Sequence, residues 1–250
     1  MPYKRSYSRR KRRGKRSYRR SRGMQRITTS RFRARNIFGD RTRVKLYFVK
    51  GEQVDVLTAT NNLVVRTFPF NSMQSIVNAF GTTPNLYALS NLYEYYRIRG
   101  IKITTRVWPA NVTDINSVNQ TVPPFLFGFN AVTDNQSFPA ANVQNFQEQR
   151  WAKARLCSNA NQGAKPATVS VYYSVNKVYG PDRVTRNDTT FIGTINQGPT
   201  PTYNAPSNSP ELQQVLFTMT GNDLTANVNV ALLHRVTVYA EFWGKVPTTE

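Results

Sequence analysis

The sequence has few of the residues that build metal sites or disulfides. Its 250 residues include one cysteine, Cys157, and one histidine, His234. A single cysteine excludes both an intrachain disulfide framework and a CxxC-type zinc site. The longest apolar runs are four or five residues, too short to cross a bilayer, and no apolar segment follows the basic start as in a secretory signal. We therefore expect no metal, no cofactor and no membrane insertion.

Acidic residues are absent from the first 39 positions, and the first one is Asp40. This segment holds 16 of the 34 basic residues of a chain whose formal net charge is +21. Residues 40–250 keep 18 basic against 13 acidic residues, a net charge of only +5. A strongly basic segment of this kind indicates a polyanionic partner. The sequence thus predicts a basic arm over residues 1–40 and an ordinary globular domain over residues 41–250.

The basic arm has the chemistry of a nucleic-acid-binding segment. It repels itself and has little to bury, which predicts disorder. Arginine outnumbers lysine 13 to 3, and guanidinium groups bind phosphates bidentately and stack on bases. Interleaved tyrosines suit single strands, and irregular spacing predicts contacts with the backbone rather than sequence reading. The predicted nucleic-acid-binding residues are Lys4, Arg5, Arg9, Arg10, Lys11, Arg12, Arg13, Lys15, Arg16, Arg19, Arg20, Arg22, Arg26, Arg31, Arg33 and Arg35.

Two consequences follow from the charge of the arm. If half of its charges met phosphates, the salt dependence of binding to a single strand would have a slope of about −6. The clusters at residues 9–13 and 19–22 also fit a nuclear import signal. We expect deletion of residues 1–39 to abolish DNA binding while the domain stays folded and able to associate.

The remainder of the chain alternates in hydrophobicity with period two, which is typical of half-buried strands. A phase slip at Gly100 predicts a β-bulge. Ser72–Gly81 reads as a helix with a serine cap and a glycine stop. Together with long polar loops, this pattern predicts an all-β antiparallel jelly-roll sandwich of about eight strands in two sheets. The predicted strands are 43–49, 63–70, 95–108, 124–132, 151–157, 169–176, 190–195, 214–220 and 232–242.

Residues for catalysis are scarce. The phosphate-loop, HExxH and GxSxG motifs are missing. His234 falls on the apolar phase of its strand, which favours a buried, hydrogen-bonded histidine over a catalytic one. Cys157 ends a predicted strand, and a small buried hydrophobe is the default interpretation. We therefore predict that the protein is not an enzyme.

The arm and two segments of the globular domain together resemble a known family. The arm opens with MPYKRSYSRRKRR, and residues 93–103 read Tyr-x-Tyr-Tyr-Arg-Ile-x-Gly-Ile-Lys-Ile. Residues 236–244 close the chain with Val-Thr-Val-Tyr-Ala-Glu-Phe-Trp-Gly. In order and length, the chain resembles the capsid proteins of circoviruses and related small circular single-stranded DNA viruses.

This resemblance implies a single jelly roll that self-assembles into a small icosahedral shell. The arm would hold a packaged circular single-stranded DNA genome, and would bind nuclear import receptors before assembly. Sulphated cell-surface glycans are a further partner that the resemblance implies. The protein would then be found in the virion and, during assembly, in the host nucleus.

Two other functions remain open on the residues alone. The first is a cellular, non-specific nucleic-acid-binding protein of chromatin or the ribosome, with a basic tail. Against it, we find no basic stripe, RNP-like motif or recognition helix in the body. The second is an enzyme on nucleic acid that uses the arm as a tether. For contacts between subunits the candidate exposed aromatics are Trp108, Phe138, Phe146, Tyr179 and Tyr203, and for each of them ordinary core burial is at least as good an interpretation.

Overall fold

The computed structural model describes residues 40–55, 63–113, 125–133, 146–157, 166–180, 188–218 and 227–246. Residues 1–39 of the predicted arm, with its sixteen basic residues and its expected disorder, lie outside the described residues. All that follows concerns the unit Phe38–Glu250. No helix in the described ranges is long and apolar enough to cross a membrane.

Ten strands and four short helical segments make up the described part of this unit. The strands are β1 (Arg41–Asp55), β2 (Leu63–Pro69), β3 (Tyr93–Thr113), β4 (Phe125–Val132), β5 (Lys153–Cys157), β6 (Ala167–Ser174), β7 (Gly193–Asn196), β8 (Thr202–Asn204), β9 (Glu211–Thr218) and β10 (Asn227–Lys245). The helical segments are α1 (Met73–Phe80), α2 (Pro84–Ser90), α4 (Val175–Tyr179) and the 3-10 helix η2 (Thr189–Phe191).

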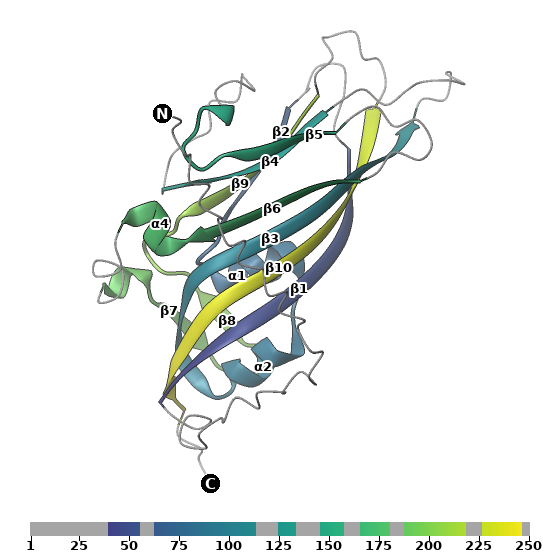
Figure 1. Cartoon of the computed structure of the whole chain (residues 1–250). Coiled ribbons are helices and arrows are strands. Elements are labelled where there is room, and N and C mark those ends of the chain that lie inside the picture. Colours follow the sequence, from purple (N-terminus) through teal and green to yellow (C-terminus); the bar gives the residue numbers. More distant parts are fainter. Residues whose placement is uncertain are drawn as a thin grey trace, which may run out of the picture. The chain divides into compact units, whose positions relative to one another are not determined.

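The strands form two antiparallel sheets (Figure 1). One has the order β1-β10-β3, with β6 and the β7-β8 pair both beside β3, and the other has the order β2-β9-β4-β5. The chain crosses repeatedly between the sheets, with β4 and β5 as neighbours in one sheet. β1 and β10, at opposite ends of this unit, pair along the whole length of β1. Without β7 and β8, each sheet has four strands: β1-β10-β3-β6 in one and β2-β9-β4-β5 in the other. This is the connectivity of a jelly roll, and it confirms the predicted fold.

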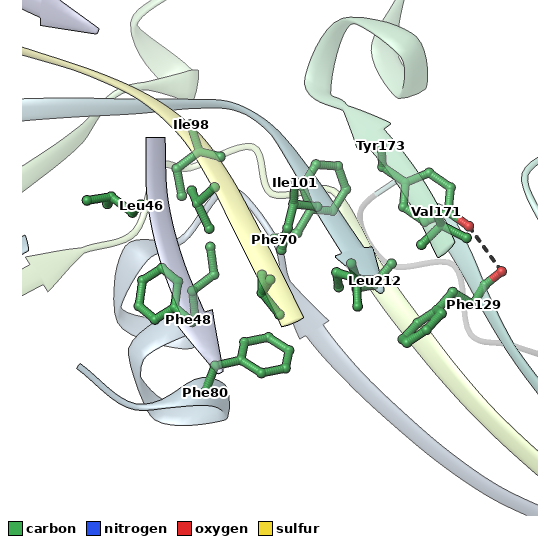
Figure 2. Packing of buried hydrophobic residues seen from close by; sticks show 14 of the residues in the cluster. Leu46, Phe48, Phe70, Phe80, Ile98, Ile101, Phe129, Val171, Tyr173 and Leu212 are labelled. Carbon is green, nitrogen blue, oxygen red and sulfur yellow. Dashed lines mark hydrogen bonds between the residues drawn. The ribbon is translucent and has the colours of Figure 1, made fainter. Parts of the chain in front are cut away.

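The core between the sheets follows from the alternation of the strands. In β1, Leu46 and Phe48 point inward and are buried. They belong to one buried cluster that also includes Phe80 of α1 and Leu212 of the second sheet (Figure 2). In β4 all eight residues are buried, because both of its faces are covered. Apolar burial of this extent is the main favourable contribution to folding.

Two short helices between β2 and β3 cover the core near β8 (Figure 1). Helix α1 begins as predicted, because the Ser72 side chain accepts a hydrogen bond from the Ser75 N–H at 3.3 Å. It ends at Gly81, whose φ of 90° favours glycine. Pro84 begins α2, where a missing N–H costs nothing.

The bulge in β3 is also confirmed. Tyr239 of β10 pairs with Gly100, whereas the next residue, Ala240, pairs with Ile98. Arg99 is therefore the extra residue. The bulge changes the side of the sheet on which the following residues lie, as the sequence predicted.

Two of the predicted strands run into a helical segment at one end. The strand expected over residues 169–176 stops at Ser174, whose side chain accepts from the Lys177 N–H at 3.1 Å and caps α4. The strand expected over residues 190–195 starts late, because the Asp188 carboxylate caps η2. In both places a local cap ends the strand pattern.

Gly193 in β7 tests the packing of the core. An alanine Cβ there would overlap the ring of Tyr96. Tyr96 is fully buried, and its hydroxyl accepts from Met73 N and donates to Asn204 O. We expect Gly193→Ala to lower the free energy of unfolding by about 1–3 kcal/mol, measured by urea titration. Gly198→Ala is the control, because a Cβ there meets nothing within 4 Å; equal midpoints for the two variants would contradict the prediction.

Candidate polyanion-binding face

The outer side of the sheet β1-β10-β3-β6 gathers basic residues from three strands. Alternation turns every second side chain away from the core, and register places these side chains in rows across the sheet. We call this surface the cationic face. Its basic residues are Arg41, Arg43, Lys45, Arg97, Arg99, Lys102, Arg106 and Arg235.

One carboxylate, that of Glu241, lies in the described rows that run from Arg41 to Gly51 of β1 across β10 and β3. Its side chain is completely buried under the arginines around it. Nη2 of Arg97 lies 2.8 Å from Oε2, and Nε of Arg43 lies 3.2 Å from Oε1. Nε of Arg41 is 3.6 Å from the same oxygen. One negative charge thus holds three positive ones at a fixed spacing.

The ionisation of Glu241 follows from these contacts. Burial opposes the charged carboxylate and is the largest single influence on it. Hydrogen bonds from Arg97 and Arg43, with the charge of Arg41, together outweigh burial and lower the pKa of Glu241 below its ordinary value. At neutral pH the group is therefore a carboxylate, and the cluster carries a net charge of +2.

Aromatic rings lie between the basic side chains of this face. Tyr95 stacks on Trp243 with ring centroids 6.1 Å apart, and the Arg41 guanidinium lies over the Trp243 ring. Tyr172 meets Tyr239 edge to face at 5.7 Å. Mixed cations and rings of this kind suit single-stranded nucleic acid, which offers both phosphates and unstacked bases.

The outer side of the second sheet has the opposite character. There Leu126, Val215 and Phe217 form a small apolar cluster. Phe146, from the segment before β5, is fully buried on it. Among the described outward positions of β2, β4 and β9, only that of Glu211 is charged, and its charge is negative. The two outer sides of the sandwich therefore differ sharply in charge.

The cationic face corrects the expectation that the body has no basic stripe. Its residues come from β1, β3 and β10, which are far apart in the sequence, and only strand pairing makes them neighbours. A usable signal was present in Arg41, Arg43 and Lys45, which alternate along one strand. The sixteen predicted arm residues are neither supported nor contradicted, since they lie outside the described residues.

The aromatic residues proposed as contacts between subunits differ in their exposure. Trp108 is 37 % exposed at the end of the cationic face. Phe146 and Tyr203 are buried, so for these two the alternative of ordinary burial holds, rather than a contact with other subunits. Tyr203 belongs to the core between the sheets, and Phe146 lies in the apolar cluster on the outer side of the second sheet. Tyr179 packs on the core against Phe191. Phe138 lies outside the described residues.

His234 is buried and hydrogen-bonded, as its strand phase predicted. Its Nδ1 lies 2.8 Å from the Thr105 hydroxyl, and its Nε2 lies 3.0 Å from Oε1 of Glu52. Cys157 is buried and free, and burial raises the pKa of its thiol to about 12. The described residues contain no cluster of three or more His, Cys, Asp or Glu side chains able to hold a metal.

The buried His234 makes stability depend on pH. Burial is the largest influence and lowers the pKa of His234 below its ordinary value of 6.5, against the opposing effect of Glu52. As pH falls below about 6.5, the unfolded chain binds a proton that the folded chain does not, so stability is lost. We expect urea midpoints to fall between pH 7.5 and 5.5, and to fall less in His234→Gln. Equal pH dependence in both proteins would contradict this.

Comparison with models of known families gives no match, and comparison with curated proteins gives none. Among solved structures, the chain is similar to a cryo-EM structure of Mud crab tombus-like virus (15% identity, 82% of each chain covered, TM-score 0.47). It is also similar to the BFDV capsid protein in a 60-mer (13% identity, 85% of this chain and 99% of that one, TM-score 0.41). A third likeness is to tobacco necrosis virus (10% identity, 83% and 84%, TM-score 0.40). At TM-scores below 0.5, these likenesses say nothing of what this chain does.

Proposed function

We propose that the protein is a structural coat protein that assembles into a closed icosahedral shell around circular single-stranded DNA. The observation that carries this proposal is the charge difference between the two outer sides of the sandwich. A shell around a polyanion needs one basic side toward its contents and another side free of that charge. The basic arm joins the sandwich at Arg41, the first residue of the cationic face.

The arm supplies most of the charge for the genome and also serves as the nuclear import signal through its two clusters. The cationic face adds eight basic residues to the sixteen of the arm. Because phosphate contacts carry no sequence information, packaging by these groups is non-specific. Sulphated glycans, which are also polyanions, are a proposed partner for attachment to the host cell.

A second function is favoured by the same cationic face. A cellular nucleic-acid-binding protein with a basic tail would also use such a surface, and the absence of a basic stripe no longer counts against it. The two functions differ in assembly. A shell requires contacts between subunits that repeat and close, whereas the cellular protein would act without forming such a particle.

The mass of the purified particle distinguishes them. The full chain, expressed without added DNA, is examined by size-exclusion chromatography with light scattering and absorbance. We expect a species above about 1 MDa, with an excess of absorbance at 260 nm that only high salt removes. A peak at the monomer mass of 28.5 kDa would overturn the shell and favour the cellular protein.

A further inference from the structure

A basic cleft opens beside the cationic face, where β6, α4 and residues 150–153 meet. Its volume is about 590 Å³. Its lining residues include no carboxylate. The cleft therefore offers positive charge in a concave site, whereas the cationic face is an open sheet surface. The side chains that define it are Lys102, Arg150, Trp151, Lys153, Tyr172 and Lys177.

Three basic side chains of the cleft contact an aromatic ring or a backbone carbonyl rather than a carboxylate. The Arg150 guanidinium and Nζ of Lys177 lie over the Trp151 ring, 4.7 and 4.6 Å from its centroid. The Tyr173 hydroxyl, 2.7 Å from the Trp151 carbonyl, fixes this segment to β6. Nζ of Lys153 donates to the Ser170 carbonyl at 2.6 Å. Since these partners are uncharged, the positive charge of the cleft is available to an anion.

Tyr172 adds a flat apolar surface next to these charges. Tyr172 is 48 % exposed although it lines the cleft. It stands opposite Lys102 in the pairing of β3 with β6. Its ring packs against that of Tyr239 at nearly a right angle, with the ring centroids 5.7 Å apart. An exposed ring that packs on a neighbouring ring, with a lysine opposite it in the sheet, can stack on a base while the lysine binds the phosphate of the same nucleotide. A sulphated sugar would use the charges but not the ring.

We propose that this cleft binds one nucleotide of a single strand, with its phosphate at Lys102 and Lys177 and its base stacked on Tyr172. The inference rests on the proposed function, which names single-stranded DNA as the nucleic acid. It deepens that function by naming a binding site on the folded domain. The arm binds phosphates anywhere along the strand, whereas the cleft fixes one nucleotide at a defined place.

Photochemical crosslinking of the full chain tests this site. The probe is an oligothymidylate that carries 5-iododeoxyuridine, and crosslinked residues are located by mass spectrometry. We expect a crosslink at Tyr172 in addition to those in the arm. In Lys102→Ala/Lys177→Ala, its yield falls by about fivefold or more relative to the arm crosslinks, and Tyr172→Ala loses it. Arg155→Ala/Lys245→Ala removes two exposed positive charges outside both the cleft and the cationic face, and leaves the yield unchanged.

Failure of this inference is distinct from failure of the proposed function. Crosslinks confined to the arm would overturn the cleft as a nucleotide site and leave DNA packaging intact. Absence of crosslinks anywhere, with no retained nucleic acid, would overturn both. Protection of Lys102 and Lys177 from acetylation by a heparin oligosaccharide, but not by the oligothymidylate, would overturn the inference in favour of sulphated glycans.

Discussion

Deletion of residues 1–39 is expected to abolish the retention of single-stranded DNA at physiological salt. The arm holds 16 of the 34 basic residues. With about eight phosphate contacts, its slope of about −6 would weaken binding by roughly 10³–10⁴-fold between 50 and 200 mM salt. The cationic face alone leaves binding that is visible only at low salt, with a shallower slope. Filter binding across a salt series measures both slopes.

The control for this deletion keeps the arm and permutes its sequence. Because phosphates are bound without regard to sequence, a permuted arm of the same composition should retain the full slope. Replacement of its basic residues by glutamine should behave like the deletion. A truncated domain that bound DNA with unchanged salt dependence would show that the arm is not the main polyanion site.

Glu241→Gln is expected to destabilise the domain while leaving DNA binding intact. The carboxylate is fully buried and holds three arginines, one of which, Arg97, is itself only 12% exposed. Removal of its charge leaves these cations to repel one another. We expect a loss of about 2–4 kcal/mol at pH 7, less than for a wholly buried pair because Arg41 and Arg43 are half exposed.

The pH dependence of this loss identifies its cause. The pKa of Glu241 lies below its ordinary value of 4.5 in the folded chain. Its contribution to stability is therefore present above about pH 4.5 and is lost as the pH falls below it. The difference in urea midpoint between wild type and variant should shrink from pH 7 to pH 3.5. A difference that stays constant would point to lost packing instead.

Asp40→Asn provides the matched control for charge. Asp40 is exposed beside β1, so its removal adds the same positive charge without disturbing a buried cluster. We expect a change in stability within about 0.5 kcal/mol. Both variants should bind DNA at least as tightly as wild type at low salt, because each makes the surface more positive. Weaker binding by Glu241→Gln would show that the spacing of the arginines, and not only their charge, matters.

The sandwich was predictable because period-two alternation is a local property. Each strand shows in its own residues which side faces the core, and the serine and glycine that bound α1 act within one turn of it. The errors lay at caps such as Ser174, where one hydrogen bond decides between a strand and a helix.

By itself, the sequence determined where the excess charge of the chain lies, that most of the domain is strand, and that His234 faces the core. These properties depend on composition and on near neighbours along the chain. Only the tertiary structure decided that Arg43, Glu241 and Arg97 form one row, and that Lys102 and Lys177 line one cleft. Such neighbours come from the pairing of distant strands, whose register is set by burial of the whole core rather than by any short segment.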